Sequence, residues 1–374
     1  MKYRDNAAVR FVCFVLLPLI ILIYSALNRG HYYSDLICLF GINLILAASL
    51  NLVNGFSGMF SMGHAAFMAV GAYTSALLTI SETQKARISG LPEWFQKFTL
   101  PFPLALICAG LVAAALALLI GFPVLRLKSH YLSVATLGLI VIVRAFLDNE
   151  DQFTNGARGI TGLPSYSTIF TVFLTGLILL YVMYRLIRCS SYGRGLIAMR
   201  DDDVAAQTLG VRLVTKKISI FCLSAFAAGI GGALWGHLQT VISGQFFYFT
   251  DSFNVVEMSI IGGMYSLSGG IVGALVMTFL PEILAPLETG IMIGGIQLPE
   301  LYGASNLIMA VLLILLIIFR RQGILGDSEI IVESIFSKST YTGIFKAETY
   351  RNLADITKAK LAGLTGKSKK QETK

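Results

Sequence analysis

The chain has 374 residues, of which 55% are hydrophobic and 13% are charged, and its mean hydropathy is +0.73. A soluble domain has about 25% charged residues, so this composition excludes a soluble globular protein and indicates an integral membrane protein. The formal net charge is +8, but the basic residues lie mostly beside the ends of apolar runs, which is typical of membrane orientation rather than of nucleic-acid binding.

The apolar runs are long and continuous, which favours helices of about 20 residues over the alternating strands of a β-barrel. We therefore expect an all-α, polytopic fold with about ten transmembrane helices. In chain order the expected spans are Phe11 to Leu27, Leu36 to Val53, His64 to Ile80, Pro103 to Ile120, Tyr131 to Leu147, Ile169 to Ile187, Ile218 to Ile242, Phe253 to Ile261, Leu267 to Leu284 and Asn306 to Phe319.

Lys and Arg concentrate on the cytoplasmic side of membrane proteins and therefore predict the orientation of the spans. If every expected span crosses the membrane, the cytoplasmic side receives all of the main basic clusters. These clusters are Lys2, Arg4 and Arg10; Arg126 and Lys128; residues 185–217; and Arg320, Arg321 and the lysine-rich tail. The sequence from Ile218 to Phe319 contains no Lys or Arg. We therefore expect both termini to be cytoplasmic.

One span and one short repeat depart from a simple row of crossing helices. Phe253 to Ile261 is too short to cross alone and predicts half of a broken helix, with the break at Gly262 and Gly263. The sequence GMFSM at 58–62 is echoed by GMYSL at 263–267, and each copy precedes a span rich in small residues. This pattern predicts duplicated halves with both copies at the inner face, which favours a parallel repeat.

The segment from Gly193 to Gly210 is charged and helical in pattern, yet it lies between apolar runs, so it needs an aqueous partner surface. Three consecutive acids stand at a plausible helix start, where carboxylates favour the positive end of the helix dipole. Two alanines and a glycine then offer a small face to a partner. An ordinary capped cytoplasmic helix is the alternative that these residues alone favour. The candidate contact residues are Arg200, Asp201, Asp202, Asp203, Ala205, Ala206 and Gly210.

Five polar side chains in or beside the apolar spans are candidates for a translocation pathway: Asn54, Ser57, Ser61, His64 and Glu257. The glycines and short polar side chains between positions 54 and 64 permit a non-helical backbone and satisfy its polar groups, so tight helix packing is an equal alternative. His64 is expected to be a hydrogen-bonded interior histidine. Glu257 is the one acid within an apolar run, and it is expected to face the bundle interior, a water-filled path or a polar partner.

Neither enzymatic nor metal chemistry is expected. Gly366-Lys367-Ser368 lacks the preceding glycine of a phosphate loop, because Leu361 stands in its place. The four histidines and five cysteines form no metal spacing, and the cysteines lie within or at the edges of apolar runs, so neither a cofactor nor a disulfide framework is expected.

Several blocks carry a more specific signal in combination. They are Asn51 to Phe67 with Gly71-Ala72-Tyr73; Arg126 to Leu132 with Ala135 to Gly138, Arg144 and Thr154 to Pro164; the charged segment with Lys217, Phe221, Ser224, Ala225 and Gly229; and Gly262-Gly263 with Ser266 to Gly269. Together they resemble the permease subunits of branched-chain amino acid ABC importers. Arg320 to Gly326 is similar to the usual ending of that family, and the blocks resemble its M-type rather than its H-type member.

The resemblance implies a type II-like ABC importer permease with broken or re-entrant helices in the bacterial inner membrane. It implies a heterodimer with an H-type sister permease, two cytoplasmic ATP-binding subunits and an external or periplasmic substrate-binding protein. Residues 1–326 would form the transmembrane domain, with 188–217 as a coupling segment in an ATPase groove, and 327–374 a poorly ordered, basic cytoplasmic tail. Leucine, isoleucine and valine are the implied substrates, while related permeases carry urea, amides or other solutes.

This chain departs from the family pattern at several positions. Val204 stands where the coupling pattern places a glutamate, and Val141 replaces an acid that many relatives have three positions before Arg144. The insert at 81–99 and the tail beyond Gly326 match nothing in the pattern. An ion-coupled secondary transporter remains the alternative of a different class, with Glu257 as its candidate carboxylate.

Overall fold

The computed structural model describes residues 32–86, 88, 90–126, 129–289, 292–293, 296–297, 303–320, 322–326 and 328–336. The expected first span, the basic residues before it, Lys128, Arg321 and the lysine-rich tail lie outside the described residues. The chain divides into two units, Arg29–Ser328 and a second made of Met1–Asn28 and Glu329–Lys374. Within the described part of the second unit lies one short helix, α17 (Ile330–Phe336).

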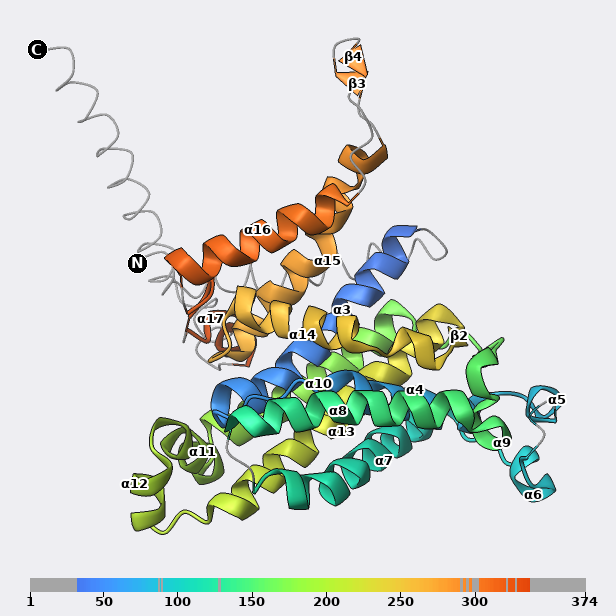
Figure 1. Ribbon diagram of the computed structural model, residues 1–374, viewed down its shortest axis with the longest axis horizontal. Helices are drawn as coiled ribbons and strands as arrows, with labels where there is room; N and C mark the ends of the chain where they lie inside the picture. Colours follow the sequence, from blue (N-terminus) through green and yellow to red (C-terminus); the bar gives the residue numbers. More distant parts are fainter. Residues whose placement is uncertain are drawn as a thin grey trace, which may run out of the picture. The chain divides into compact units, whose positions relative to one another are not determined.

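Every span expected from Leu36 onward coincides with a helix of the larger unit (Figure 1). These helices are α3 (Tyr32–Asn51), α4 (His64–Thr79), α7 (Phe102–Val124), α8 (Ser129–Asn149), α10 (Ile169–Arg188), α13 (Leu213–Gln239), α14 (Phe249–Gly262), α15 (Leu267–Thr289) and α16 (Ala304–Phe319). Among the described residues, six helices are long and apolar enough to cross a membrane, namely α3 with its continuation, α7, α8, α10, α13 and α15. The remaining helices of this set are shorter.

Short elements join the long helices. They are the π-helix η2 (Leu52–Phe56), α5 (Glu82–Lys85), α6 (Glu93–Gln96), α9 (Asp151–Thr154), η3 (Gly156–Arg158), β1 (Ile160–Thr161), α11 (Ser191–Asp201), α12 (Asp203–Thr208), β2 (Val241–Ile242), η4 (Gly244–Phe246), β3 (Met292–Ile293) and β4 (Ile296–Gln297). β1 pairs antiparallel with β2, and β3 pairs antiparallel with β4. The insert at 81–99 supplies α5 and α6.

Helices α3 and α13 form the centre of the larger unit, and α13 packs against α3, α4 and α7. Glycines allow the backbones of α4 and α13 to touch. An ideal Cβ at Gly71 would lie 2.1 Å from the carbonyl oxygen of Gly229, and one at Gly232 would lie 2.0 Å from that of Met68. Such close contact of helix backbones is the usual purpose of small residues in membrane helices.

The two ends of the larger unit carry different elements. Helices α11 and α12 lie beside one end of α7, α8 and α13, whereas α5, α6, α9 and β2 lie at the opposite end (Figure 1). The charged segment and the loops that join α8 to α10 and α13 to α14 are therefore separated by the length of a membrane-spanning helix.

Candidate functional site

Two turns interrupt helices in the larger unit and lie side by side. The first turn (residues 57–63) joins η2 to α4, and the second turn (residues 263–266) joins α14 to α15. The break expected after the short span is present, because α14 ends and Gly263 has φ +122, a backbone conformation that favours glycine. An ideal Cβ at Gly55 would lie 1.7 Å from the carbonyl oxygen of Met264. Gly55 of η2, just before the first copy of the repeat, thus touches the second copy, and the parallel arrangement of the two copies stays a prediction.

Asn51, at the end of α3, connects to the second turn through its side chain. The buried Asn51 amide donates to the carbonyl oxygens of Gly263 at 3.3 Å and Ser266 at 2.8 Å, and the Ser259 hydroxyl donates to Asn51 Oδ1. A helix that stops inside the bundle leaves carbonyl groups without partners, and Asn51 supplies donors beside that end. Asn51 was recognised in the sequence only as the first residue of a family block.

The end of α14 is completed by the segment at 322–326, which follows α16. The backbone N–H of Ile324 donates to the carbonyl oxygen of Ile261 at 3.0 Å, and that of Leu325 donates to Gly262 at 3.1 Å. These bonds satisfy two of the carbonyl groups that a helix leaves free at its end. The block that resembles the family ending thus has a structural role at the break in α14.

Three of the candidate pathway residues hold the first turn together. The Asn54 amide donates to the carbonyl oxygen of Ser61 at 3.1 Å and accepts from the Ser61 N–H at 2.9 Å, while the Ser57 hydroxyl donates to the carbonyl oxygen of Val53 at 2.7 Å. Asn54, Ser57 and Ser61 are all buried. Their hydrogen bonds fit the packing alternative, because each satisfies backbone that is not part of a regular helix.

His64 is buried at the start of α4 beside Ser224 of α13. The Ser224 hydroxyl donates to the carbonyl oxygen of Ser49 at 2.6 Å and lies 3.1 Å from His64 Nε2. Because that hydroxyl has a single proton, the second bond requires His64 Nε2–H as the donor, which places a proton on Nε2. Nδ1 is buried and has no partner among the described residues. This is the geometry of an interior histidine.

Glu257 lies in the middle of α14 and is half-buried. It belongs to a stripe of partly exposed residues at helical spacing, which consists of Phe253, Asn254, Glu257 and Ile260. No residue in the described part of the chain forms an ion pair or a hydrogen bond with the Glu257 carboxylate. The structure does not bring Glu257 into the hydrogen-bond network of the first turn.

The charged segment folds as two helices rather than one. α11 ends at Asp201, and α12 begins at Asp203 with Asp202 as its N-cap. The Asp202 carboxylate accepts from two backbone N–H groups at 2.8 and 3.0 Å, as expected at a helix start. The expectation is wrong for Asp201, which lies at the negative end of the α11 dipole and pairs instead with Arg200 at 2.9 Å.

The surface of α12 also differs from the expected face of small residues. Ala205 and Gly210 are exposed, but Ala206 is buried within the chain and presents no surface to a partner. The side chains that protrude are Val204, 71% exposed, and Leu209, 81% exposed. Leu209 was missed in the sequence, where its only signal is a large apolar residue within a charged segment.

Arg200 connects this segment to both turns. An ideal Cβ at Gly58 in the first turn would lie 3.1 Å from Arg200 Cγ, and the guanidinium carbon lies 5.0 Å from the ring centre of Tyr265 in the second turn. A cavity of about 680 Å³ lies beside this contact, lined by residues of the first turn, of α11 and α12 and of the start of α13. Asp203 in its wall pairs with Lys217 at 2.8 Å.

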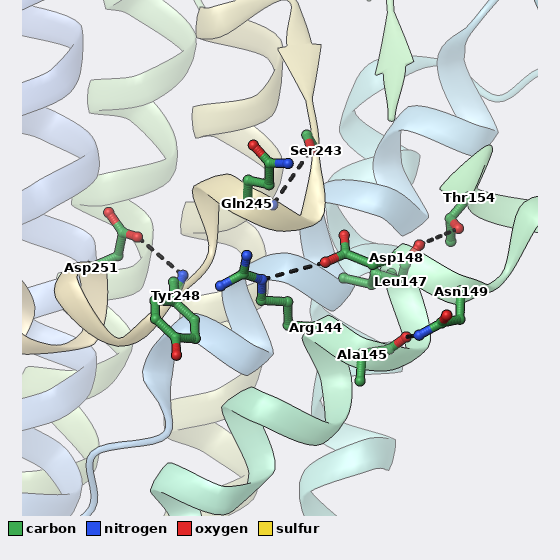
Figure 2. A network of polar contacts seen from close by, with 10 residues as sticks. All are labelled: Arg144, Ala145, Leu147, Asp148, Asn149, Thr154, Ser243, Gln245, Tyr248 and Asp251. Carbon is green, nitrogen blue, oxygen red and sulfur yellow. Dashed lines mark hydrogen bonds and ion pairs between the residues drawn. The ribbon is translucent and has the colours of Figure 1, made fainter. Parts of the chain in front are cut away.

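The opposite end of the larger unit has a second charged group, drawn in Figure 2. Arg144 Nε lies 3.4 Å from Asp148 Oδ2, and the Arg144 guanidinium carbon lies 4.3 Å from the centre of the Tyr248 ring. The Tyr248 N–H donates to Asp251 Oδ2 at 3.1 Å. Val141 provides no acid before Arg144, so Asp148 on the following turn is the carboxylate that pairs with this arginine.

Comparison with known proteins places these features in one family. The model of the family described as branched-chain amino acid transport system / permease component matches residues 32–320. The chain is 30% identical over 357 residues to the high-affinity branched-chain amino acid transport system permease protein LivM of Salmonella typhimurium and of Escherichia coli K12, which covers 86% of this chain and 76% of each relative. It is 22% identical over 304 residues to the LivH permease protein of Escherichia coli K12, over 76% of this chain and 92% of that relative. No solved structure matches it significantly. The chain is a multi-pass membrane protein and belongs to the family of branched-chain amino acid transport system permease components.

Proposed function

We propose that this chain is a non-catalytic permease subunit of an ATP-driven ABC importer for leucine, isoleucine and valine. The names of its LivM and LivH relatives support a branched-chain amino acid as cargo and an H-type permease as the other half of the membrane pore. In this proposal an external binding protein delivers the amino acid, and two cytoplasmic ATP-binding subunits hydrolyse ATP.

The contact of Arg200 with both turns is the observation that carries the proposal. Arg200 lies at the end of α11 and touches the first turn at Gly58 and the second at Tyr265. A partner that moves α11 and α12 would therefore move two interruptions in the membrane helices together. We assign the partner contact to seven exposed residues of this segment, namely Asp201, Asp202, Asp203, Val204, Ala205, Leu209 and Gly210. Ala206 is buried beneath that surface.

The proposed orientation places α11, α12 and both termini in the cytoplasm of the inner membrane. It rests on the basic residues of the 185–217 segment and on the absence of Lys and Arg from Ile218 to Phe319 in the sequence. The tail at 327–374 is assigned to the same side. The end that carries Arg144 and β2 would then face the external binding protein.

The proposed pathway runs past the exposed stripe of α14. A carboxylate in a membrane-spanning region is costly in lipid, so Glu257 is assigned to a water-filled path. Asn54, Ser57, Ser61 and His64 are assigned to the frame of the first turn, which the path passes, rather than to direct substrate contact.

Reconstitution tests the proposal. The chain, its sister permease and the two ATP-binding subunits would be purified together, placed in liposomes and supplied with the binding protein and radiolabelled leucine. We expect uptake that requires ATP and stops when the ATP-binding subunits carry a hydrolysis-deficient substitution. Uptake by this chain alone, driven by an ion gradient, would instead establish a secondary transporter. ATP-driven uptake of urea or an amide without leucine uptake would correct the cargo.

A further inference from the structure

We propose that the guanidinium of Arg144 binds the carboxylate of the transported amino acid, at the end of the pathway opposite α11 and α12. The inference rests on the proposed function and extends it to a specific binding group. It also separates possible cargoes, because an amino acid has a carboxylate, whereas urea and simple amides have none.

Neighbouring groups hold Arg144 in place but leave some of its N–H donors free to bind a ligand. The Tyr248 ring covers one face of the guanidinium at 4.3 Å, and Nε contacts Asp148 Oδ2 at 3.4 Å. A charge-assisted hydrogen bond is usually about 2.7–2.9 Å long, so this pair is loose. The structure gives no acceptor for Nη1 or Nη2 among the described residues, and the side chain is 31% exposed. The free edge of the guanidinium is thus available for a bidentate contact with a carboxylate.

Asp148 fixes the direction of this free edge. Its Oδ1 atom is buried, and an ideal Cβ at Gly244 would lie 2.2 Å from that atom. Oδ1 therefore faces η4, while Oδ2 is the oxygen on the Arg144 side, as Figure 2 shows. Asp148 thus acts on the substrate through Arg144 and is a positioning residue.

The surroundings of Arg144 suit an aliphatic amino acid. The Tyr248 ring beside it is exposed, as are Phe246 and Phe249, which flank Tyr248 within three residues of the chain. They supply apolar surface for an aliphatic side chain. An arginine on a membrane-spanning helix is stable when it faces water or a polar partner rather than lipid, so the edge of Arg144 is directed toward the pathway.

Charge balance favours an amino acid over another anion. Arg144 and Asp148 together carry no net charge, and the Asp148 side chain is itself 26% exposed. A zwitterion is also neutral, so its carboxylate can bind Arg144 while its ammonium group lies toward Asp148. A lipid phosphate, or an acidic side chain of the docked binding protein, would bring an uncompensated negative charge next to the Asp148 carboxylate.

The test uses the complete assembly in liposomes with the leucine-loaded binding protein. We expect Arg144→Gln to lower ATP-dependent leucine uptake at least tenfold, while ATP hydrolysis stimulated by the binding protein stays within twofold of wild type. Arg144→Lys keeps the positive charge but cannot make a bidentate contact with a carboxylate, so it should restore part of the uptake. Asp148→Asn should lower uptake less than Arg144→Gln does. Arg158→Gln, at an exposed position of η3 at the same end, is the matched control and should leave uptake unchanged.

Each other outcome overturns the inference. Normal uptake by Arg144→Gln would remove the arginine from cargo binding. An increase in the binding-protein concentration needed for half-maximal ATP hydrolysis, with an unchanged number of leucines per ATP, would assign Arg144 to protein docking. A defect that appears in phosphatidylglycerol vesicles and not in phosphatidylcholine vesicles would assign it to lipid phosphate. Misfolding is separated by the Tm of each variant. A wild-type assembly that fails to take up leucine would overturn the proposed function itself.

Discussion

Gly55 touches the second turn so closely that an ideal Cβ at this position would lie 1.7 Å from the carbonyl oxygen of Met264. The contact joins η2, which precedes the first copy of the repeat, to Met264 in the second copy, after the end of α14. Neither backbone can yield easily, because η2 continues α3 and the second turn is held by Asn51. No residue with a side chain fits at position 55 without separating η2 from the second turn.

We therefore expect Gly55→Ala to destabilise the folded chain by about 3 kcal/mol or more, as overpacking against backbone does. The measurement is the midpoint of thermal unfolding in detergent. Gly138 in α8 is the matched control, because an added Cβ there meets no atom within 4 Å. Gly138→Ala should leave the midpoint unchanged or raise it, since alanine favours a helix over glycine. Equal midpoints for the two variants would contradict the contact.

Arg200 is expected to transmit movement rather than to stabilise the fold. Arg200→Ala removes the contact with Tyr265 and the pair with Asp201, both of which lie at the surface of the membrane bundle. In the reconstituted assembly it should lower leucine uptake at least fivefold while ATP hydrolysis continues. Arg200→Lys should restore part of the uptake, because lysine also interacts with an aromatic ring. Parallel loss of hydrolysis and uptake would place Arg200 in assembly instead.

Asp202→Ala should loosen α12 specifically. The Asp202 carboxylate accepts two backbone N–H groups at the start of this helix, and loss of an N-cap costs about 1 kcal/mol. Hydrogen exchange of the Val204 and Ala205 amides should accelerate about fivefold, which is the rate factor that corresponds to that energy for local opening. Asp202→Asn is the control, since asparagine also caps helices and should preserve the protection. Unchanged exchange in Asp202→Ala would show that the cap does not hold α12.

Much of the fold could be predicted because it depends on patterns that are local in the sequence. Hydrophobic length predicted α3, α4, α7, α8, α10, α13, α14, α15 and α16, and the glycines at 262 and 263 predicted the break before α15; the structure confirms both. The charged segment was less predictable. Its division at Asp202 depends on one extended residue between α11 and α12, and three consecutive acids do not show which of them is the cap.

The contacts that hold the candidate site together could not be predicted from the sequence, because they join segments that are far apart in it. Asn51 meets the second turn more than 200 residues away, and Ile324 returns to the end of α14 only after α16. Ala206 was assigned to the partner surface from its small size, but size does not show on which side of a short helix a residue lies. Position 141 has no acid to pair with Arg144. Asp148 pairs with Arg144 instead, because residues four positions apart lie on the same face of a helix.

Lys85 should make the stability of the chain depend on pH. It is buried, its Nζ donates to the carbonyl oxygen of Phe98, and Nζ lies 5.1 Å from the Phe95 ring centre. Burial lowers the pKa of Lys85 below its ordinary value, so the folded state releases this proton at a lower pH than the unfolded state. Between these two pKa values the unfolded state binds more protons, and stability rises with pH.

We expect the Tm of wild type to rise relative to that of Lys85→Met as the pH increases through the range just below 10.5, the ordinary pKa of lysine. Methionine has a similar length and no titratable group, so residue 85 contributes no pH dependence to the stability of this variant. Lys97→Met, in the same insert, is the control and should follow wild type. A constant difference between wild type and Lys85→Met would show that Lys85 does not titrate in this range.

Glu257→Gln tests whether the charge in the middle of α14 serves transport. The carboxylate has no ion pair or hydrogen bond with any residue that the structure describes, so its replacement by an amide removes no stabilising contact. We expect an unchanged Tm and a leucine uptake reduced several-fold, because a half-buried charge without a protein partner is maintained by water in the path. Ile260→Val, one turn further on the same stripe, should reduce uptake little. Full uptake together with full stability would remove the Glu257 charge from the mechanism, whereas a large loss of Tm would assign it to the structure of the bundle.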